Sequence, residues 1–114
     1  MKIEICSYGS IRIDGREYRK DLKIVGGRVR TGWWRQEGHV LKTEDVKDLL
    51  EASPQVLVIG TGTQGQMRIS QETRKTLDES RIISRIGRTC RAVDIFNRLS
   101  SEGKDVAAAF HLTC

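Results

Sequence analysis

The chain has 114 residues, of which 31% are charged and 38% hydrophobic, a balance typical of soluble globular domains. This length predicts a single domain over residues 1–114 with enough buried surface to fold without a disulfide or a metal. The net charge of +5 is spread along the sequence instead of forming a basic run, which argues against a dedicated nucleic-acid-binding protein. No apolar run reaches the roughly 20 residues that a membrane-spanning helix needs, so we expect no membrane partner.

The first third of the sequence predicts short strands separated by turns. "KIEIC" and "SIRI" alternate apolar and polar residues, and Asp14–Gly15 is a strong hairpin-turn signal. "LKIV" and "RVRTGWW" follow, separated by Gly26–Gly27. We interpret this region as an antiparallel meander with one face exposed to solvent.

Two adjacent tryptophans, Trp33 and Trp34, end this region. Neighbouring residues on a strand point to opposite faces, so one ring can enter the core while the other is exposed or covered by a partner. Exposed tryptophans are enriched at protein interfaces. The pair is therefore the best indication in the sequence of a protein partner or of self-association.

The second half of the chain predicts a β-α-β-α-β unit. Thr43, Ser70 and Thr89 are the candidate helix caps, and the last helix extends to about Glu102. The apolar runs that alternate with these helices are "QVLVI", "RIISRI" and "DVAAAFHLT". Right-handed crossovers would make these strands parallel, with the helices packed on the sheet. The expected fold is a compact three-layer α/β domain with N-terminal antiparallel strands and a mixed sheet.

A glycine-rich loop follows the first of these strands and fits the pattern G-x-G-x-x-G at Gly60, Gly62 and Gly65. In a dinucleotide-binding fold the helix opens within the motif, whereas here three residues separate the loop from the cap at Ser70. A weaker form of the hypothesis is a small-anion or nucleotide-fragment site where two helix N-termini meet guanidinium groups. The candidate ligand-binding residues are Gly60, Thr61, Gly62, Gly65, Arg68, Arg88, Arg91 and Asn97. The alternative is that the glycines only form turns and the arginines are only solvated.

The remaining candidates for chemistry are cysteines and histidines. Cys6, Cys90 and Cys114 are odd in number and lack C-x-x-C spacing, which predicts no metal site, no disulfide framework and a reducing cytoplasm. Cys90 begins a helix beside arginines, so it is either a reactive thiol or a small packing residue. His111 lies in an apolar strand and is expected to be a hydrogen-bonded structural residue, and His39 has no local nucleophilic partner. We assign no catalytic residue and no cofactor.

Taken in order, several segments resemble one known family. These are "IRIDGREYRKDLKI", a tryptophan before "GHVL", "VLVIGTGTQGQMRIS", "RTCRAVDIFNRLSSEGKDVAAAF" and "HLTC". They resemble the Mth-type domain of adipogenesis-associated proteins and of a mitochondrial complex I assembly factor, a family of unknown biochemical function. The resemblance implies a three-layer α/β fold with a mixed sheet. It also implies assembly or regulatory roles in animal members, without an established catalytic activity.

These observations lead to two function hypotheses. The first is a small non-catalytic module that binds a partner protein through the tryptophan region or the edge of the glycine loop. The second is a binding module for a small anionic ligand at that same loop edge. An enzyme is the less favoured class, because no constellation of catalytic side chains emerges from the sequence.

Overall fold

The computed structural model describes residues 1–35 and 37–114. A three-stranded antiparallel sheet comprises β1 (Ile3–Ser7), β2 (Ser10–Ile13) and β3 (Arg16–Tyr18). A five-stranded sheet has the order β5 (Arg28–Thr31), β4 (Leu22–Val25), β10 (Val106–His111), β7 (Val56–Thr61) and β9 (Ile83–Gly87). Two short strands, β6 (Val40–Leu41) and β8 (Arg68–Ile69), pair with each other. The helical segments are η1 (Thr43–Val46), α1 (Lys47–Glu51), α2 (Gln71–Glu79) and α3 (Thr89–Ser101).

The five-stranded sheet is mixed, as the sequence predicts. β7 pairs in parallel with both β10 and β9, whereas β10 pairs antiparallel with β4. Every residue of β7 and β10 is buried, which is the environment that an uninterrupted apolar run requires. Because β10 is the central strand of the five, its carboxyl end at His111 lies between the ends of β4 and β7.

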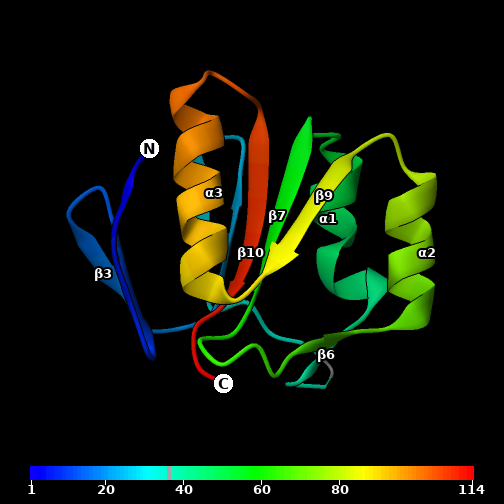
Figure 1. The fold of residues 1–114 in the computed structure, drawn as a ribbon, viewed down its shortest axis with the longest axis horizontal. Helices are drawn as coiled ribbons and strands as arrows, with labels where there is room; N and C mark the ends of the chain where they lie inside the picture. The colour runs from blue at the N-terminus through cyan, green and yellow to red at the C-terminus, as the bar shows by residue number, and fades with distance from the viewer. Residues whose placement is uncertain (36) are drawn as a thin grey trace.

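Alternate residues of β7 supply two separate cores. Val58 packs in one cluster with Ala92 and Phe96 of α3, whereas Leu57 packs in another with Leu49 of α1 and Leu77 of α2. The sheet is therefore the middle layer of three. Figure 1 shows α3 and the β1–β3 sheet on one side of the view and α1 and α2 on the other.

The prediction of one N-terminal meander is wrong, because the first five strands belong to two sheets. Leu22 and Ile24 of β4 are almost completely buried, and β4 obtains that environment by pairing with β10 instead of β3. The tryptophans also lie beyond the end of β5 and not on a strand. A run of short alternating segments does not reveal where the chain passes from one sheet to the next.

Of the three predicted helix caps, only the one at Ser70 is confirmed. Its hydroxyl accepts a hydrogen bond from the N–H of Thr73. Thr43 begins a 3₁₀ turn and its hydroxyl contacts that of Thr73. Thr89 is already the first residue of α3, after an N-cap at Arg88, and its hydroxyl bridges the loop and β10 instead of capping.

The prediction that no disulfide forms is also wrong. Cys6 on β1 and Cys90 in the first turn of α3 form a disulfide, with their Cα atoms 5.6 Å apart. The two residues are separated by 84 positions in the sequence, so spacing carries no signal of the bond. Cys90 is therefore not a free thiol in this structure, whereas Cys114 is.

None of the described helices is long and apolar enough to cross a membrane.

Candidate functional site

The glycine loop lies at the carboxyl end of the parallel strands. Figure 1 places the starts of α2 and α3 at this same end of the molecule, at the bottom of the view, but on different sides of it. The N–H of Thr89 donates to Gly62 O, which brings the start of α3 directly against the loop. The N–H of Ser70 instead donates to Leu41 O, so the start of α2 is joined to β6. The expected common edge is present, but of these two helix starts it is that of α3 whose backbone is hydrogen-bonded to the glycine loop.

Close packing accounts for two of the three motif glycines. A Cβ on Gly60 would lie 2.8 Å from Thr89 Oγ1 and 2.9 Å from the Phe110 ring. Gly62 has a φ of +105°, and a Cβ there would collide with the backbone of Cys114. These positions require glycine because a side chain has no space there.

The backbone N–H groups of the loop are largely used within the protein. Thr63 donates to Thr113 O at 2.6 Å, and Gln66 donates to Cys114 O at 2.9 Å. The N–H of Gly62 donates to Thr89 Oγ1 at 2.9 Å. A phosphate loop presents such groups to its ligand, whereas this loop presents them to Thr89, Thr113 and Cys114 of its own chain.

The other candidate ligand residues are distributed around this edge. Thr61 is buried and its hydroxyl donates to Gly87 O, and the side chain of Arg88 lies against Gly65. Arg68, Arg88 and Arg91 are exposed. The structure therefore brings the loop residues and Arg88 together, with Arg68 on β8 and Arg91 within the first turn of α3.

Asn97 lies two turns further along α3 and away from the loop. Its Nδ2 donates to Ile3 O at 2.7 Å, and its Oδ1 accepts from Ile3 N–H at 2.9 Å. Both polar atoms of this amide therefore bind β1. The structure therefore does not bring Asn97 to the loop with the other candidate ligand residues, and its amide is used within the fold.

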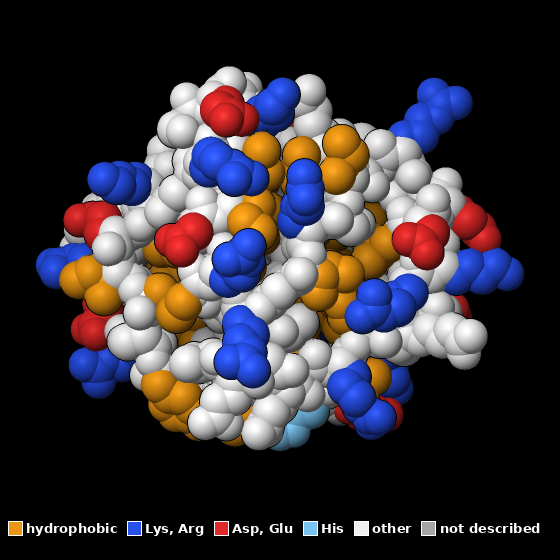
Figure 2. Space-filling view, in the orientation of Figure 1, with side chains coloured by type: hydrophobic (Ala, Val, Ile, Leu, Met, Phe, Trp, Pro, Cys, Tyr) orange, Lys and Arg blue, Asp and Glu red, His pale blue; other side chains and the backbone are white. Residues whose placement is uncertain are grey.

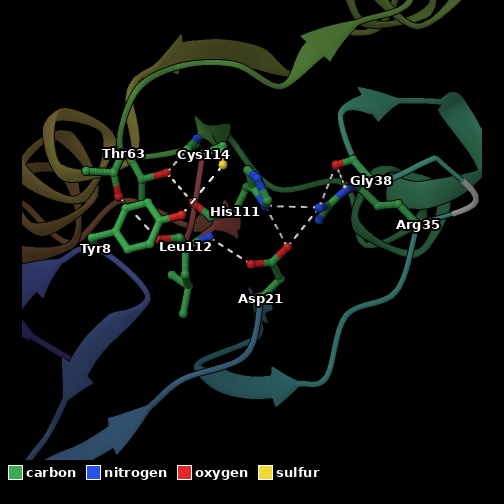
Figure 3. Close-up of polar contacts among 10 residues, drawn as sticks. Tyr8, Asp21, Arg35, Gly38, Thr63, His111, Leu112 and Cys114 are labelled. Atoms are coloured by element: carbon green, nitrogen blue, oxygen red, sulfur yellow. Dashed lines mark hydrogen bonds and ion pairs between the residues drawn. The ribbon is translucent and has the colours of Figure 1, made fainter.

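A buried polar cluster lies beside the loop, and sequence reasoning identified only its histidine. Asp21 Oδ2 is 2.7 Å from His111 Nδ1 and 2.8 Å from Arg35 Nη2 (Figure 3). Asp21 Oδ1 accepts the N–H of Leu112 at 2.7 Å, and Arg35 donates to Gly38 O through Nε and Nη2. His111 and Arg35 are more than nine-tenths buried. The cluster joins the start of β4 to the end of β10 across the sheet edge.

The charges of the cluster fix its hydrogen-bonding pattern. Burial by itself would raise the pKa of Asp21, but hydrogen bonds from His111, the Leu112 N–H and Arg35 lower that pKa overall. An ionised carboxylate only accepts, so we assign the proton on His111 Nδ1 to the bond with Asp21. Arg35 Nη2, 3.0 Å from the same nitrogen, is then a donor to the carboxylate and not to the ring.

Two nitrogens of the cluster have no hydrogen-bond partner among the described residues, His111 Nε2 and Arg35 Nη1, and both are buried. A carboxylate that orients an imidazole is also found beside catalytic nucleophiles. A general base must reach its substrate, however, and this Nε2 is shielded from solvent. In this conformation the cluster therefore acts as a polar cross-link within the fold.

Among the residues that the structure describes, neither a metal-binding group nor a thiol hydrogen-bonded to the imidazole is found beside the cluster. No group of three or more His, Cys, Asp or Glu side chains within residues 1–35 and 37–114 could hold a metal ion. The Cys114 thiol is 3.6 Å from the Tyr8 hydroxyl, on the far side of His111 from Asp21 in Figure 3. His39 is exposed, and its ring lies edge-on to His111 with centroids 5.8 Å apart.

The two tryptophans have opposite environments. Trp33 is 8% exposed and its Nε1 donates to Asp45 O, whereas Trp34 is 85% exposed. One buried and one exposed ring is the outcome that the sequence predicts, although it arises in a loop and not on a strand.

Comparison with known proteins gives a consistent result. The family model described as "Protein of unknown function (DUF498/DUF598)" matches residues 3–111. The structure of a conserved hypothetical protein from Pyrococcus horikoshii OT3 is 28% identical, with a TM-score of 0.81 over 100% of both chains. An outer membrane protein from Bartonella henselae is 31% identical, with a TM-score of 0.82 over 98% of this chain and 94% of that one. A Mth938-like domain from Bordetella pertussis, at 17% identity, shares the fold with a TM-score of 0.64 over 97% of this chain and 85% of that one.

Proposed function

Since the chain belongs to the DUF498/DUF598 family of Mth938-like domains of unknown function, we propose from its surface that it is a non-catalytic protein-interaction module. The single observation that carries the proposal is the exposure of Trp34. An indole ring that is 85% exposed leaves a large apolar area in water. Burial of such a ring in a partner contributes strongly to binding, and tryptophan is enriched among the residues that dominate interfaces.

The residues on either side of Trp34 are held in place. The N–H of Trp33 donates to Asp21 O at 2.8 Å, and its indole donates to Asp45 O at 3.1 Å. The guanidinium carbon of Arg35 lies 4.7 Å from the centroid of the Trp33 ring, and the same side chain binds Asp21. Because both neighbours are anchored, the backbone of Trp34 loses little conformational freedom when a partner binds.

The proposal is tested by affinity purification from the native cell with the wild-type chain and with Trp34→Ala. We expect at least one partner to be recovered with the wild type and lost with Trp34→Ala, while the melting temperature is unchanged. Ile5→Ala is the matched control, because Ile5 is a large apolar residue on β1 that is 52% exposed. Equal recovery with Trp34→Ala and the control contradicts the proposal. Sedimentation velocity distinguishes a foreign partner from a second copy of the chain.

A second candidate function is the binding of a small anion at the loop edge. It is favoured by the position of Arg88 against Gly65 at the start of α3, with the exposed Arg91 in the first turn of that helix. Because the loop N–H groups are used internally, guanidinium groups would have to provide most of the binding. A rise in melting temperature with phosphate, sulfate or nucleotides supports this candidate, and an unchanged value contradicts it.

A further inference from the structure

The outer strand β9 presents unpaired backbone groups to solvent. It occupies one end of the five-stranded sheet, and β7 is its one neighbour among the described strands. The N–H of Ile83 donates to Gln55 O at 3.1 Å, on the β7 side. In a parallel ladder, alternate residues direct both backbone groups to the same neighbour. Ser84 and Ile86 therefore direct their N–H and C=O groups to the open side, where an added strand can pair with them.

The side chains of β9 distinguish this edge from the opposite one. Ile83 is 58% exposed and Ile86 is 36% exposed. β5 is the other outer strand of this sheet. Its apolar residue Val29 packs against the core, and none of the residues of β5 is a large apolar one that is exposed. Ser84 Oγ is also buried without a hydrogen-bond partner among the described residues. β9 thus combines free backbone groups with apolar surface, whereas β5 does not.

The charges around β9 specify the chemistry of the occupant. Arg81, Arg85 and Arg88 are all exposed, on the strand or within two residues of its ends. Figure 2 shows Lys and Arg side chains down the middle of this face with hydrophobic side chains between them. Two copies of β9 paired with each other would bring these arginines together, and like charges in direct opposition across strands are destabilising. Acidic side chains on the added strand would be attracted instead.

We propose that β9 binds an extended acidic segment of a partner protein as an additional strand of the sheet. The backbone of that segment pairs with Ser84 and Ile86, which provides affinity without sequence specificity. Ile83 and Arg85 lie on one face of β9, because alternate residues share a face. An apolar residue of the segment therefore packs on Ile83, and a carboxylate two residues away pairs with Arg85. This surface is distinct from Trp34, which follows β5 at the other end of the sheet, so each proposal can fail without the other.

The test is a selection of random twelve-residue peptides displayed on phage against the wild-type protein. We expect enrichment of peptides in which Asp or Glu alternates with Val, Ile or Leu. A synthetic peptide of the enriched sequence should slow hydrogen exchange at the Ser84 and Ile86 amides. Its affinity should fall by about tenfold with Arg85→Glu, which corresponds to the loss of one well-placed interfacial ion pair. Arg28→Glu is the matched control, because it makes the same charge change on the exposed surface of β5 and should leave the affinity unchanged.

Three outcomes would overturn the proposal. The first is the absence of enrichment, or enrichment of peptides without acidic residues. The second is equal affinity of the selected peptide for the wild type and for Arg85→Glu. The third is protection of the Ser84 and Ile86 amides that rises with protein concentration in the absence of peptide, which would identify a second copy of the chain as the occupant.

Discussion

Asn97 of α3 binds both backbone polar groups of Ile3 on β1. Asn97 Nδ2 donates to Ile3 O at 2.7 Å, and Asn97 Oδ1 accepts the N–H of Ile3 at 2.9 Å. β1 is an outer strand of its sheet, with β2 on one side. On the other side, the Asn97 side chain takes the place of a neighbouring strand at Ile3. The three-stranded sheet is therefore attached to the rest of the molecule by a side-chain amide as well as by apolar contacts.

Replacement of Asn97 by Ala should lower the free energy of unfolding by about 1–3 kcal/mol, because both groups of Ile3 lose a partner in a partly buried position. Chemical denaturation monitored by tryptophan fluorescence measures the effect. Asp94→Ala, an exposed change on the same helix, is the control and should stay within about 0.5 kcal/mol of the wild type. If the two variants prove equally stable, the amide does not hold β1 in place.

Reduction of the Cys6–Cys90 disulfide should lower the free energy of unfolding by about 2–4 kcal/mol, since the bond closes a long loop in the unfolded chain. Denaturation with and without reductant measures this, with a Cys6→Ser/Cys90→Ser double variant as the reductant-insensitive control.

Rapid alkylation of the thiols in cells then tests the expected cytoplasmic location. A cytoplasmic chain should be recovered mainly reduced, and recovery of the oxidised form would contradict that location.

Gly62→Ala should destabilise the protein by about 1–3 kcal/mol through backbone strain and collision with the segment at Cys114. Gly87→Ala is the comparison, because a Cβ there meets nothing within 4 Å and the residue lies on β9. Its stability should equal that of the wild type within about 0.5 kcal/mol. Thermal denaturation of both variants decides whether the loop glycine is needed for packing; equal melting temperatures would exclude that role.

The stability of the protein should fall in acid through Asp21. Its folded-state pKa is lowered, so its stabilising effect is present at neutral pH and is lost as the pH falls through the folded-state pKa. Asp21→Asn should be less stable than the wild type at pH 7 and should lose less stability below about pH 5. Asp78→Asn, an exposed change on α2, is the control. Parallel stability–pH curves for the wild type and Asp21→Asn would show that the carboxylate does not act this way.

Local patterns predicted the elements whose environment is uniform. The unbroken apolar runs of β7 and β10 indicate strands covered on both faces, and Ser70 is the type of residue that begins a helix. The N–H group that Ser70 accepts from, at Thr73, is only three residues away. Each of these signals lies within a few consecutive residues. The mixed sheet and the position of the glycine loop at its edge followed from them.

Contacts between distant residues could not be predicted in the same way. Asp21 and His111 are separated by 90 positions and meet only because β4 pairs with β10. Cys6 and Cys90 meet only because β1 packs against α3. The same limit applies to the loop glycines, since their neighbours at Thr89 and Cys114 are also remote in sequence.

The position of β10 has a consequence for synthesis of the chain. Both of its neighbours, β4 and β7, precede it in the sequence, and β10 separates them in the finished sheet. Until residues 106–111 have emerged from the ribosome, the inner edges of β4 and β7 have no partner, and the nascent chain carries two incomplete halves of a sheet. Folding of this sheet must therefore wait for β10. A chaperone that shields apolar segments would act before β10 is synthesised, while β4 and β7 are still unpaired.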